Sequence, residues 1–489
     1  MSAPDSTPKG GHVFDLAVGE TVEVHLADGS TRRLSLVGVH EPRCKARGLI
    51  RFPKVTVEID GERAEVPAAL YHMPQTVGGI RVGCSVTRGI VEAVGRHRNV
   101  YAMDKDARLR CWPIDGPLFD ETPLVYPTKQ VWFASMTQMA NERCYTDGGE
   151  LPALDASKDY IYHHYGLDLG GLDKVVPVVA PRSGTLVCRG EDAVADYDDE
   201  AAGQRRYDRV TVRDETGWYF RYSHLDMIDP DLELGQSVEA GDFLGFLGKE
   251  GSSGGWSHLH FSIASPQPSG RYGEVEGYPF LVEAYLHERP GSLLPCARPH
   301  RVGVVGESIE LDGSRSICDG GDIVAYRWAL QNGEVVDGVK ATVSYPVEGM
   351  YSEMLTVADG QDRTAIDFCV VQILPQDGDP TRTPPAMHLA AYPTEGVRPG
   401  QPMAFKVRTF FKGAFEDNSA GEEVWAFGDG TTATTCSSSP GRGSACADTD
   451  YAERWHTYDS PGRYIVTTHR SGKNGLTATA QIVVHINEA

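Results

Sequence analysis

Short runs in which apolar and polar residues alternate recur along most of the chain and restrict it to a fold built from strands. Examples near the start are ETVEVHL, RRLSLVGV and KVTVEI. A period of two places the apolar side chains on one face of a strand. Asp28-Gly29 and Asp60-Gly61, between such runs, are typical of hairpin turns. The pattern therefore predicts a mostly β protein, with one short helix at 278–288 (YPFLVEAYLHE) that Pro290 ends.

A chain of 489 residues is too long for one ordinary core, so we expect several domains. The predicted limits are 1–120 for a small N-terminal β domain, 121–290 for the domain with the strong motifs, and 297–375 and 387–489 for two similar modules. The two modules carry Trp328 and Trp425 in matching strands. Many short strands around one core Trp predict two immunoglobulin-like β-sandwiches. The Pro-rich segment between them, PQDGDPTRTPPA, is predicted to act as a semi-rigid spacer.

The charge of the chain limits its partners. The formal net charge is −22, from 68 acidic and 46 basic residues. This excess argues against nucleic acid as a partner, because such binding depends on neutralising phosphates. It also disfavours anionic membrane surfaces. No segment approaches the ~20 apolar residues that a transmembrane helix needs, so none is predicted.

The ten cysteines contain no Cys-x-x-Cys pair, which argues against zinc ribbons and thioredoxin-like redox motifs. Cys436 and Cys446 flank the segment SSSPGRGSA and are candidates for a local disulfide. The alternative is that all ten are buried or free thiols in a reducing compartment.

Three segments hold polar residues where an ordinary strand would not have them. They are HHYGLDLGG at 163–171, YFRYSHLD at 219–226 and GGWSHLHFSI at 254–263. Taken singly, each histidine could be an exposed or hydrogen-bonded residue as readily as a metal ligand or a catalytic group.

The strand period in these segments nevertheless predicts that several metal-binding side chains share a face. In SHLHFSI, a period of two points His258 and His260 to the same face. His164 and Asp168 are four residues apart and share a face if their segment is extended. Histidines with one carboxylate are a normal ligand set for catalytic zinc, which keeps a fourth position for water. Mg²⁺ and Ca²⁺ would need more oxygen ligands.

The order and spacing of these motifs resemble the M23 family of zinc metallopeptidases, the lysostaphin/LytM type. The matching stretches are HYGLDLGG, VVAPRSGTLV, RYSHLD, LGQSVEAGDFLGFLG, KEGSSGG and HLHF. The resemblance covers roughly residues 160–265. It implies an antiparallel β-sheet metallopeptidase domain with one Zn²⁺ per chain. It further implies the following roles: His164, Asp168 and His260 as zinc ligands, and His224 and His258 as catalytic histidines.

The chain departs from the family pattern beside the last motif. The family often has Pro before the His-x-His strand and Glu after it, whereas this chain has Trp256-Ser257 and Ser262. Trp256 either lines the substrate cleft or packs in the interior. An acidic insertion at 190–206 is a solvated loop, gates the cleft, or selects basic substrate groups.

The second C-terminal module resembles the PKD domain through WAFGDG and HTYDSPGRYIV, and the first is a weaker match. PKD domains occur mostly on extracellular and surface proteins. This resemblance implies an extracellular, periplasmic or cell-surface protein, although MSAPDSTPKGG at the start is not a signal peptide. We therefore expect that a leader is absent from this chain.

The resemblance predicts a zinc-dependent endopeptidase that hydrolyses peptide bonds in bacterial peptidoglycan. One alternative is a secreted protease of the same type that acts on extracellular proteins. Another is a non-catalytic wall-binding scaffold that activates other hydrolases. A carbohydrate-active enzyme would need two carboxylates across a cleft, and no motif supports it. Residues 1–120 carry no identifiable chemistry, and occlusion of the cleft is one hypothesis for them.

Overall fold

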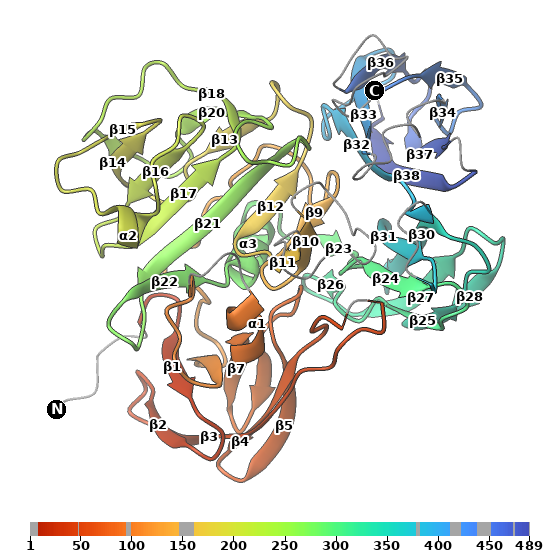
Figure 1. Ribbon diagram of the computed structural model, residues 1–489. Helices are drawn as coiled ribbons and strands as arrows, with labels where there is room; N and C mark the ends of the chain where they lie inside the picture. Colours follow the sequence, from red (N-terminus) through yellow and green to blue (C-terminus); the bar gives the residue numbers. More distant parts are fainter. Residues whose placement is uncertain are drawn as a thin grey trace.

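The computed structural model describes residues 8–46, 48–93, 99–145, 161–377, 382–410, 422–437, 451–472 and 475–488. Strands make up 48% of the protein and helices 5%, which confirms the mostly β prediction. Figure 1 shows four groups of strands in chain order. The exact residue limits of the four domains stay predictions.

The N-terminal group consists of two four-stranded antiparallel sheets, β1-β8-β7-β6 and β2-β3-β4-β5. Their strands are β1 (His12–Leu16), β2 (Thr21–His25), β3 (Thr31–His40), β4 (Lys54–Ile59), β5 (Glu62–Pro67), β6 (Gln75–Val77), β7 (Ile80–Thr87) and β8 (Ala107–Trp112), and helix α1 is Arg88–Ala93. The run KVTVEI forms β4, in which Val55, Val57 and Ile59 are buried in alternation. The alternating pattern therefore identified both the strand and its buried face.

The second group is built on a nine-stranded sheet with the order β15-β14-β16-β17-β21-β12-β9, to which β19 and β22 add at β14 and β21. Its strands are β9 (Thr137–Gln138), β12 (Leu167–Gly170), β14 (Gly184–Arg189), β15 (Asp192–Ala193), β16 (Val210–Arg213), β17 (Tyr219–Ser223), β19 (Ser237–Val238), β21 (His258–Pro266) and β22 (Tyr272–Val275). A smaller sheet joins β13 (Pro177–Val179), β20 (Phe243–Leu247) and β18 (Leu225–Ile228), and β10 (Arg143–Tyr145) pairs with β11 (Ile161–His163). Helix α2 spans Asp199–Ala202.

Helix α3 (Tyr278–Glu288) has the bounds that its sequence pattern predicts and joins the first two groups. The Glu283 carboxylate accepts hydrogen bonds from the backbone amides of Leu118 and Phe119, at 2.7 and 3.1 Å. The Phe119 ring meets Phe280 of the helix edge-on, with centroids 5.3 Å apart. Both rings belong to the large core of the second group, so the N-terminal sheets are fixed against it.

The two C-terminal modules are sandwiches. The first contains β23 (Leu293–Leu294), β24 (Arg301–Val304), β25 (Ile309–Asp312), β26 (Ile317–Cys318), β27 (Ile323–Ala329), β28 (Val335–Asp337), β29 (Lys340–Val343), β30 (Gly349–Asp359) and β31 (Thr364–Leu374). The second contains β32 (Ala386–Tyr392), β33 (Pro402–Phe410), β34 (Glu423–Ala426), β35 (Thr432–Thr435), β36 (Ala452–Thr457), β37 (Gly462–Ser471) and β38 (Thr477–Ile486). Trp328 and Trp425 are fully buried, one in each core, as the repeat predicts.

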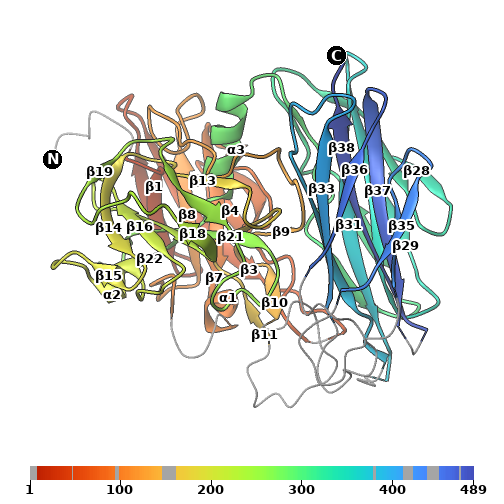
Figure 2. The same ribbon diagram turned by 90° about the horizontal axis from the view of Figure 1, so that it is seen from above.

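The two modules contact each other directly; the Pro-rich segment between them lies partly outside the described residues, so its action as a semi-rigid spacer stays a prediction. Strands β30 and β38 pair directly in parallel, through Gly349 with Thr477 and Met350 with Ala478. One sheet therefore continues from the first module into the second, in the order β31-β30-β38-β37. Figure 2 shows the long strands of both modules together on one side of the molecule.

The second module also contacts the second group of strands. Lys406 donates to the Asp173 carboxylate at 2.8 Å, and an Arg408 guanidinium nitrogen donates to the Gly255 carbonyl at 2.6 Å. The Ser257 amide donates to the Tyr451 hydroxyl at 2.8 Å. These contacts fix the segment that precedes β21.

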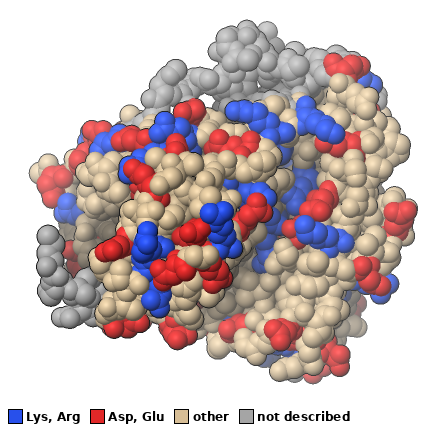
Figure 3. Space-filling view, turned by 90° about the horizontal axis from the view of Figure 1, so that it is seen from below, with Lys and Arg blue, Asp and Glu red and all other residues tan. Residues whose placement is uncertain are grey.

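The surface does not separate into large regions of one sign on the face that Figure 3 shows, where acidic and basic side chains are interspersed. Among the described residues, no helix combines the length and the apolar character that a membrane crossing requires.

Candidate metal centre

Three neighbouring strands of the large sheet bring the predicted site residues together. Strand β21 lies between β17 and β12, so both neighbours face its first residues. In register, Asp168 of β12 lies opposite His260, and Ser223 of β17 lies opposite His260 from the other side. Residues that are far apart in sequence are therefore adjacent because of the strand order.

A turn, rather than a straight strand, brings His164 to Asp168. Gly166 lies between them with φ +77°, in the left-handed region that favours glycine. A Cβ at this position would come within 3.0 Å of the His260 ring. The Gly in HYGLD therefore permits both the turn and the close approach of the chain to the site.

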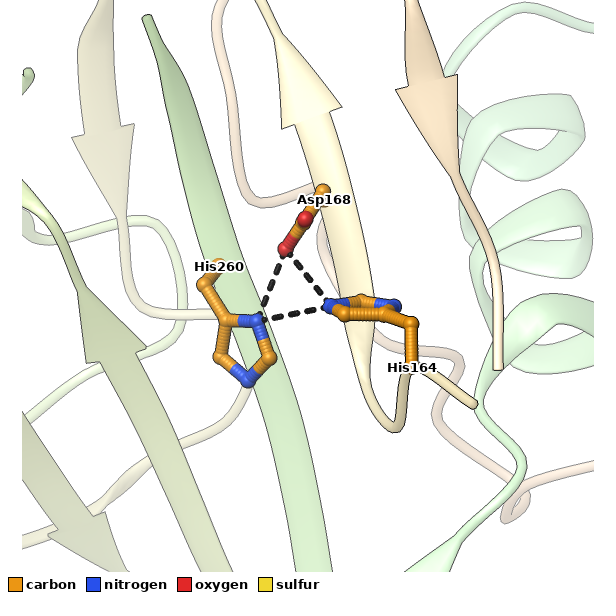
Figure 4. A group of neighbouring side chains, drawn as sticks. All are labelled: His164, Asp168 and His260. Atoms are coloured by element: carbon orange, nitrogen blue, oxygen red, sulfur yellow. Dashed lines mark hydrogen bonds and ion pairs between the residues drawn. The ribbon is translucent and has the colours of Figure 1, made fainter. Parts of the chain in front are cut away.

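The predicted metal ligands form a compact triangle, drawn in Figure 4. His164 Nε2 is 3.1 Å from His260 Nδ1 and 3.1 Å from Asp168 Oδ1. His260 Nδ1 is 2.7 Å from the same oxygen of Asp168. The sequence thus named the three side chains that converge here.

The triangle fits a tetrahedral metal ion. Zinc bonds of about 2.0–2.1 Å at tetrahedral angles put neighbouring ligand atoms about 3.3 Å apart, close to the observed spacings. Burial lowers the pKa of His260 to about 4. Burial alone would raise the pKa of Asp168, but the adjacent His164 and His258 hold it well below its usual value. His260 and Asp168 therefore favour the deprotonated forms that bind metals. Although burial opposes it, Asp168 raises the pKa of His164, so a metal ion would displace a proton from that ring.

His258 lies beside this triangle with one nitrogen occupied. Its Nδ1 is 3.0 Å from the Trp256 carbonyl oxygen, and its Nε2 is 3.5 Å from Asp168 Oδ2. The carbonyl can only accept, so Nδ1 carries the proton and Nε2 presents its lone pair toward the centre.

His224 connects β17 to β18 and adopts an uncommon backbone conformation, with φ +69°. Its backbone amide donates to Asp208 Oδ2 at 3.0 Å. Its Nδ1 lies 2.7 Å from the Glu250 carbonyl oxygen and 3.1 Å from Asp208 Oδ2. Its ring centroid is 4.8 Å from that of His258. The two histidines therefore lie side by side next to the triangle, each with Nε2 free of these anchors.

Asp208 is a residue of this site that the sequence reasoning missed. It is buried, and Arg206 donates to its two oxygens at 2.9 and 2.8 Å. Although burial would raise the pKa of Asp208, the bonds from His224 and Arg206 hold it well below its usual range. RRYDRV resembles an ordinary charged turn, so only the fold shows that this carboxylate supports His224.

Asp208→Ala should lower kcat about 10- to 100-fold, because His224 loses the acceptor that fixes its ring and backbone. The metal content and the KM should change little, since Asp208 is not in the ligand triangle. Steady-state kinetics on a peptide substrate, with metal analysis of the same sample, would measure this. Asp208→Asn, which retains an acceptor, should recover part of the loss. Wild-type kcat in Asp208→Ala would contradict the supporting role.

Trp256 lies away from solvent, with 6% of its surface exposed. Its ring stacks on His258 at a centroid distance of 3.8 Å and joins an apolar cluster with Met387 and Leu389 of the second module. Its role in substrate binding stays a prediction. Cys436 is disulfide-bonded, and Cys446, its predicted partner, lies outside the described residues.

The acidic insertion contains β15 and α2, and its role as a loop or at the cleft stays a prediction. Asp198 caps α2 by accepting hydrogen bonds from the amides of Glu200 and Ala201. The Asp198 carboxylate, which is part of the negative charge of this insertion, therefore stabilises the start of α2.

Comparisons with known proteins agree with the geometry. Residues 162–271 match the model of peptidase family M23, and residues 294–371 match that of the PKD domain. No curated protein matches the sequence.

Solved structures similar to parts of the chain have low TM-scores, which do not establish a shared fold over its whole length. A protein named as a LytM glycyl-glycine endopeptidase from Ruminococcus gnavus is 27% identical, with a TM-score of 0.19. The match covers 30% of this chain and 61% of that protein. The catalytic domain of the prophage-encoded M23 protein EnpA from Enterococcus faecalis is 21% identical over 27% of this chain and 85% of its own, with a TM-score of 0.18.

A third similar structure is the PKD1 domain of Epp from Vibrio anguillarum, which is 23% identical over 17% of this chain and 93% of its own, with a TM-score of 0.15. The chain therefore carries a domain of peptidase family M23 at residues 162–271 and a PKD domain at residues 294–371.

Proposed function

We propose that this chain is a zinc-dependent endopeptidase that hydrolyses peptide bonds in bacterial peptidoglycan, outside the cytoplasm. The observation that carries the proposal is the triangle of His164, Asp168 and His260, with sides of 2.7 to 3.1 Å. Two further histidines beside it supply the acid–base groups that a hydrolase needs. The match to peptidase family M23 supports the reaction class.

The proposed ligands are His164 Nε2, Asp168 Oδ1 and His260 Nδ1, which hold one Zn²⁺ per chain. Zinc bound there would lower the pKa of a water molecule and polarise the scissile carbonyl. The remaining work falls to the protein. Of His224 and His258, one accepts the proton of the attacking water at Nε2. The other, in its protonated form, donates to the carbonyl oxygen as negative charge develops.

The M23 match supports a peptidase for both substrate classes, so the digestion experiment below decides between peptidoglycan and extracellular protein. The proposal also places the protein outside the cytoplasm, as the PKD match suggests. The scaffold alternative is disfavoured because all five site residues are retained and each is buried or held by named contacts.

Full-length protein should release soluble peptide fragments from purified peptidoglycan, with new amino termini that mass spectrometry identifies. Walls with direct stem-peptide crosslinks and walls with glycine bridges should be tested in parallel, because the two contain different scissile bonds. A fibrous protein substrate is the control for the protease alternative. Digestion of that protein without any wall cleavage would overturn the proposal, as would wall binding by a metal-free protein that cuts neither.

A further inference from the structure

A groove of about 570 Å³ begins at the metal centre and is lined on one side by His260, Ser262 and Tyr165. The loop before β8 of the N-terminal group contributes Asn99 and Val100 to its wall. The segment around α2, within the acidic insertion, contributes the opposite wall through Gly203 and its neighbours. The groove is therefore formed jointly by regions outside the ligand strands.

Four arginines line this groove, and three of them are neutralised by carboxylates. Arg206 pairs with Asp208 at 2.8 Å, and Arg271 pairs with Asp104 at 2.6 Å. The buried Arg221 is paired with Glu274. These three cations already have their counter-ions within the protein.

Arg209 is different. Its Nε donates to the Ser223 hydroxyl at 2.8 Å and one terminal nitrogen donates to the Gln204 carbonyl at 2.6 Å, both neutral acceptors. No carboxylate of the described residues forms an ion pair with it. Burial, together with the neighbouring Arg221 and Arg206, lowers the pKa of Arg209. A partly buried guanidinium in this position gains from an anion supplied from outside.

Arg209 lies close to the proposed metal centre. Ser223, its hydrogen-bond partner, immediately precedes His224 and lies opposite His260 across the sheet. Arg209 and His260 line the same groove, so an anion bound by Arg209 lies near a peptide held at the centre.

We propose that Arg209 binds a carboxylate of the substrate, so that the enzyme selects peptides with a free carboxylate near the scissile bond. This inference rests on the proposed function. The carboxylate is either the C-terminal group of a stem peptide or an acidic side chain within it. In both cases the guanidinium offers its remaining donors as a charge-assisted pair.

The test uses crosslinked peptide fragments prepared from peptidoglycan in three forms. In one form all carboxylates are free, in the second only the C-terminal one is a carboxamide, and in the third only the side-chain one is a carboxamide. Wild-type kcat/KM should fall about 10- to 100-fold for one of the two amidated forms, because a charged hydrogen bond is lost. The form that loses activity identifies the recognised group.

Arg209→Met should lose the preference, with the three forms cut at rates within about threefold of one another, and Arg209→Lys should retain a reduced preference. Arg205→Met is the matched control, because Arg205 is exposed and pairs with Asp199 outside the groove. It should behave as wild type. Thermal unfolding and metal content of each variant exclude a folding defect.

The failure of this inference differs from the failure of the proposed function. Equal wild-type rates on all three forms would overturn the role of Arg209 while leaving the peptidase intact. If no form is cut, the proposed function fails, and calorimetric binding of the free and amidated fragments then decides the inference. Equal affinities would overturn it, whereas weaker binding of one amidated form, abolished in Arg209→Met, would support it.

Discussion

Asp168→Ala is expected to reduce bound zinc from about one to less than about 0.1 per chain and to lower kcat/KM on wall peptides by at least about 10³-fold. The carboxylate lies within 3.1 Å of both imidazole ligands and is the only anionic member of the triangle. Its loss removes a ligand and leaves two neutral nitrogens, which hold zinc poorly. A rate loss of 10³ corresponds to about 4 kcal/mol of transition-state stabilisation, a normal share for a metal.

Elemental analysis of the purified protein and kinetics on the same sample would measure both effects. His163→Gln is the matched control, since His163 is adjacent in sequence to His164 but lies outside the triangle. It should retain its zinc. Chelation of the wild type should reproduce the Asp168→Ala loss, and zinc should restore it only in the wild type. A fully active Asp168→Ala protein would rule out the proposed centre.

His224→Gln should lower kcat by about 10²- to 10⁴-fold while the protein keeps its zinc. The His224 ring is held by Asp208 and the Glu250 carbonyl beside the triangle, so its loss removes a proton-transfer or charge-stabilising group without removing a ligand. The KM should change by much less than kcat, because the effect belongs to the transition state.

His287→Gln, on the exposed part of α3, is the control for a general effect of replacing histidine. It should be indistinguishable from wild type. If His224→Gln loses zinc together with activity, then His224 is a ligand and the proposed division between ligands and catalytic histidines is incorrect. If it loses neither, His224 has no part in the chemistry.

Sequence periodicity predicted strands and helices well where the apolar residues of the pattern are also the residues buried in the structure. Strand β4 alternates in sequence and in burial, and α3 has the predicted bounds because a helical pattern ends at Pro290. The ligand triangle could be predicted because its members lie in short motifs that resemble those of peptidase family M23. Strand period alone placed His258 and His260 on one face without choosing between them, and it did not predict the turn at Gly166.

Asp208 and Arg209 could not be found in this way. Both belong to a charged stretch that is typical of a solvated turn, and their roles come from the pairing of β16 with β17, which brings them beside Ser223 and His224. Long-range pairing of this kind leaves no local trace in the sequence.

The packing of the second C-terminal module against the second group of strands could not be predicted from the sequence either. Lys406 and Arg408 alternate along β33 as any exposed strand residues would, yet Lys406 contacts Asp173 and Arg408 contacts Gly255. The sequence allows Trp256 either to line the substrate cleft or to pack in the interior. In the structure its ring packs against His258 and the second module.

This packing bears on how small an active version of the enzyme can be made. The segment before β21 is held by the Tyr451 hydroxyl, which accepts a hydrogen bond from the Ser257 amide although the two residues are 194 positions apart in the sequence. A fragment trimmed after residue 290 would uncover the indole and release the Gly255 carbonyl and Ser257 amide to water. Such a fragment is therefore expected to hold the segment before β21 less rigidly than the full-length chain does.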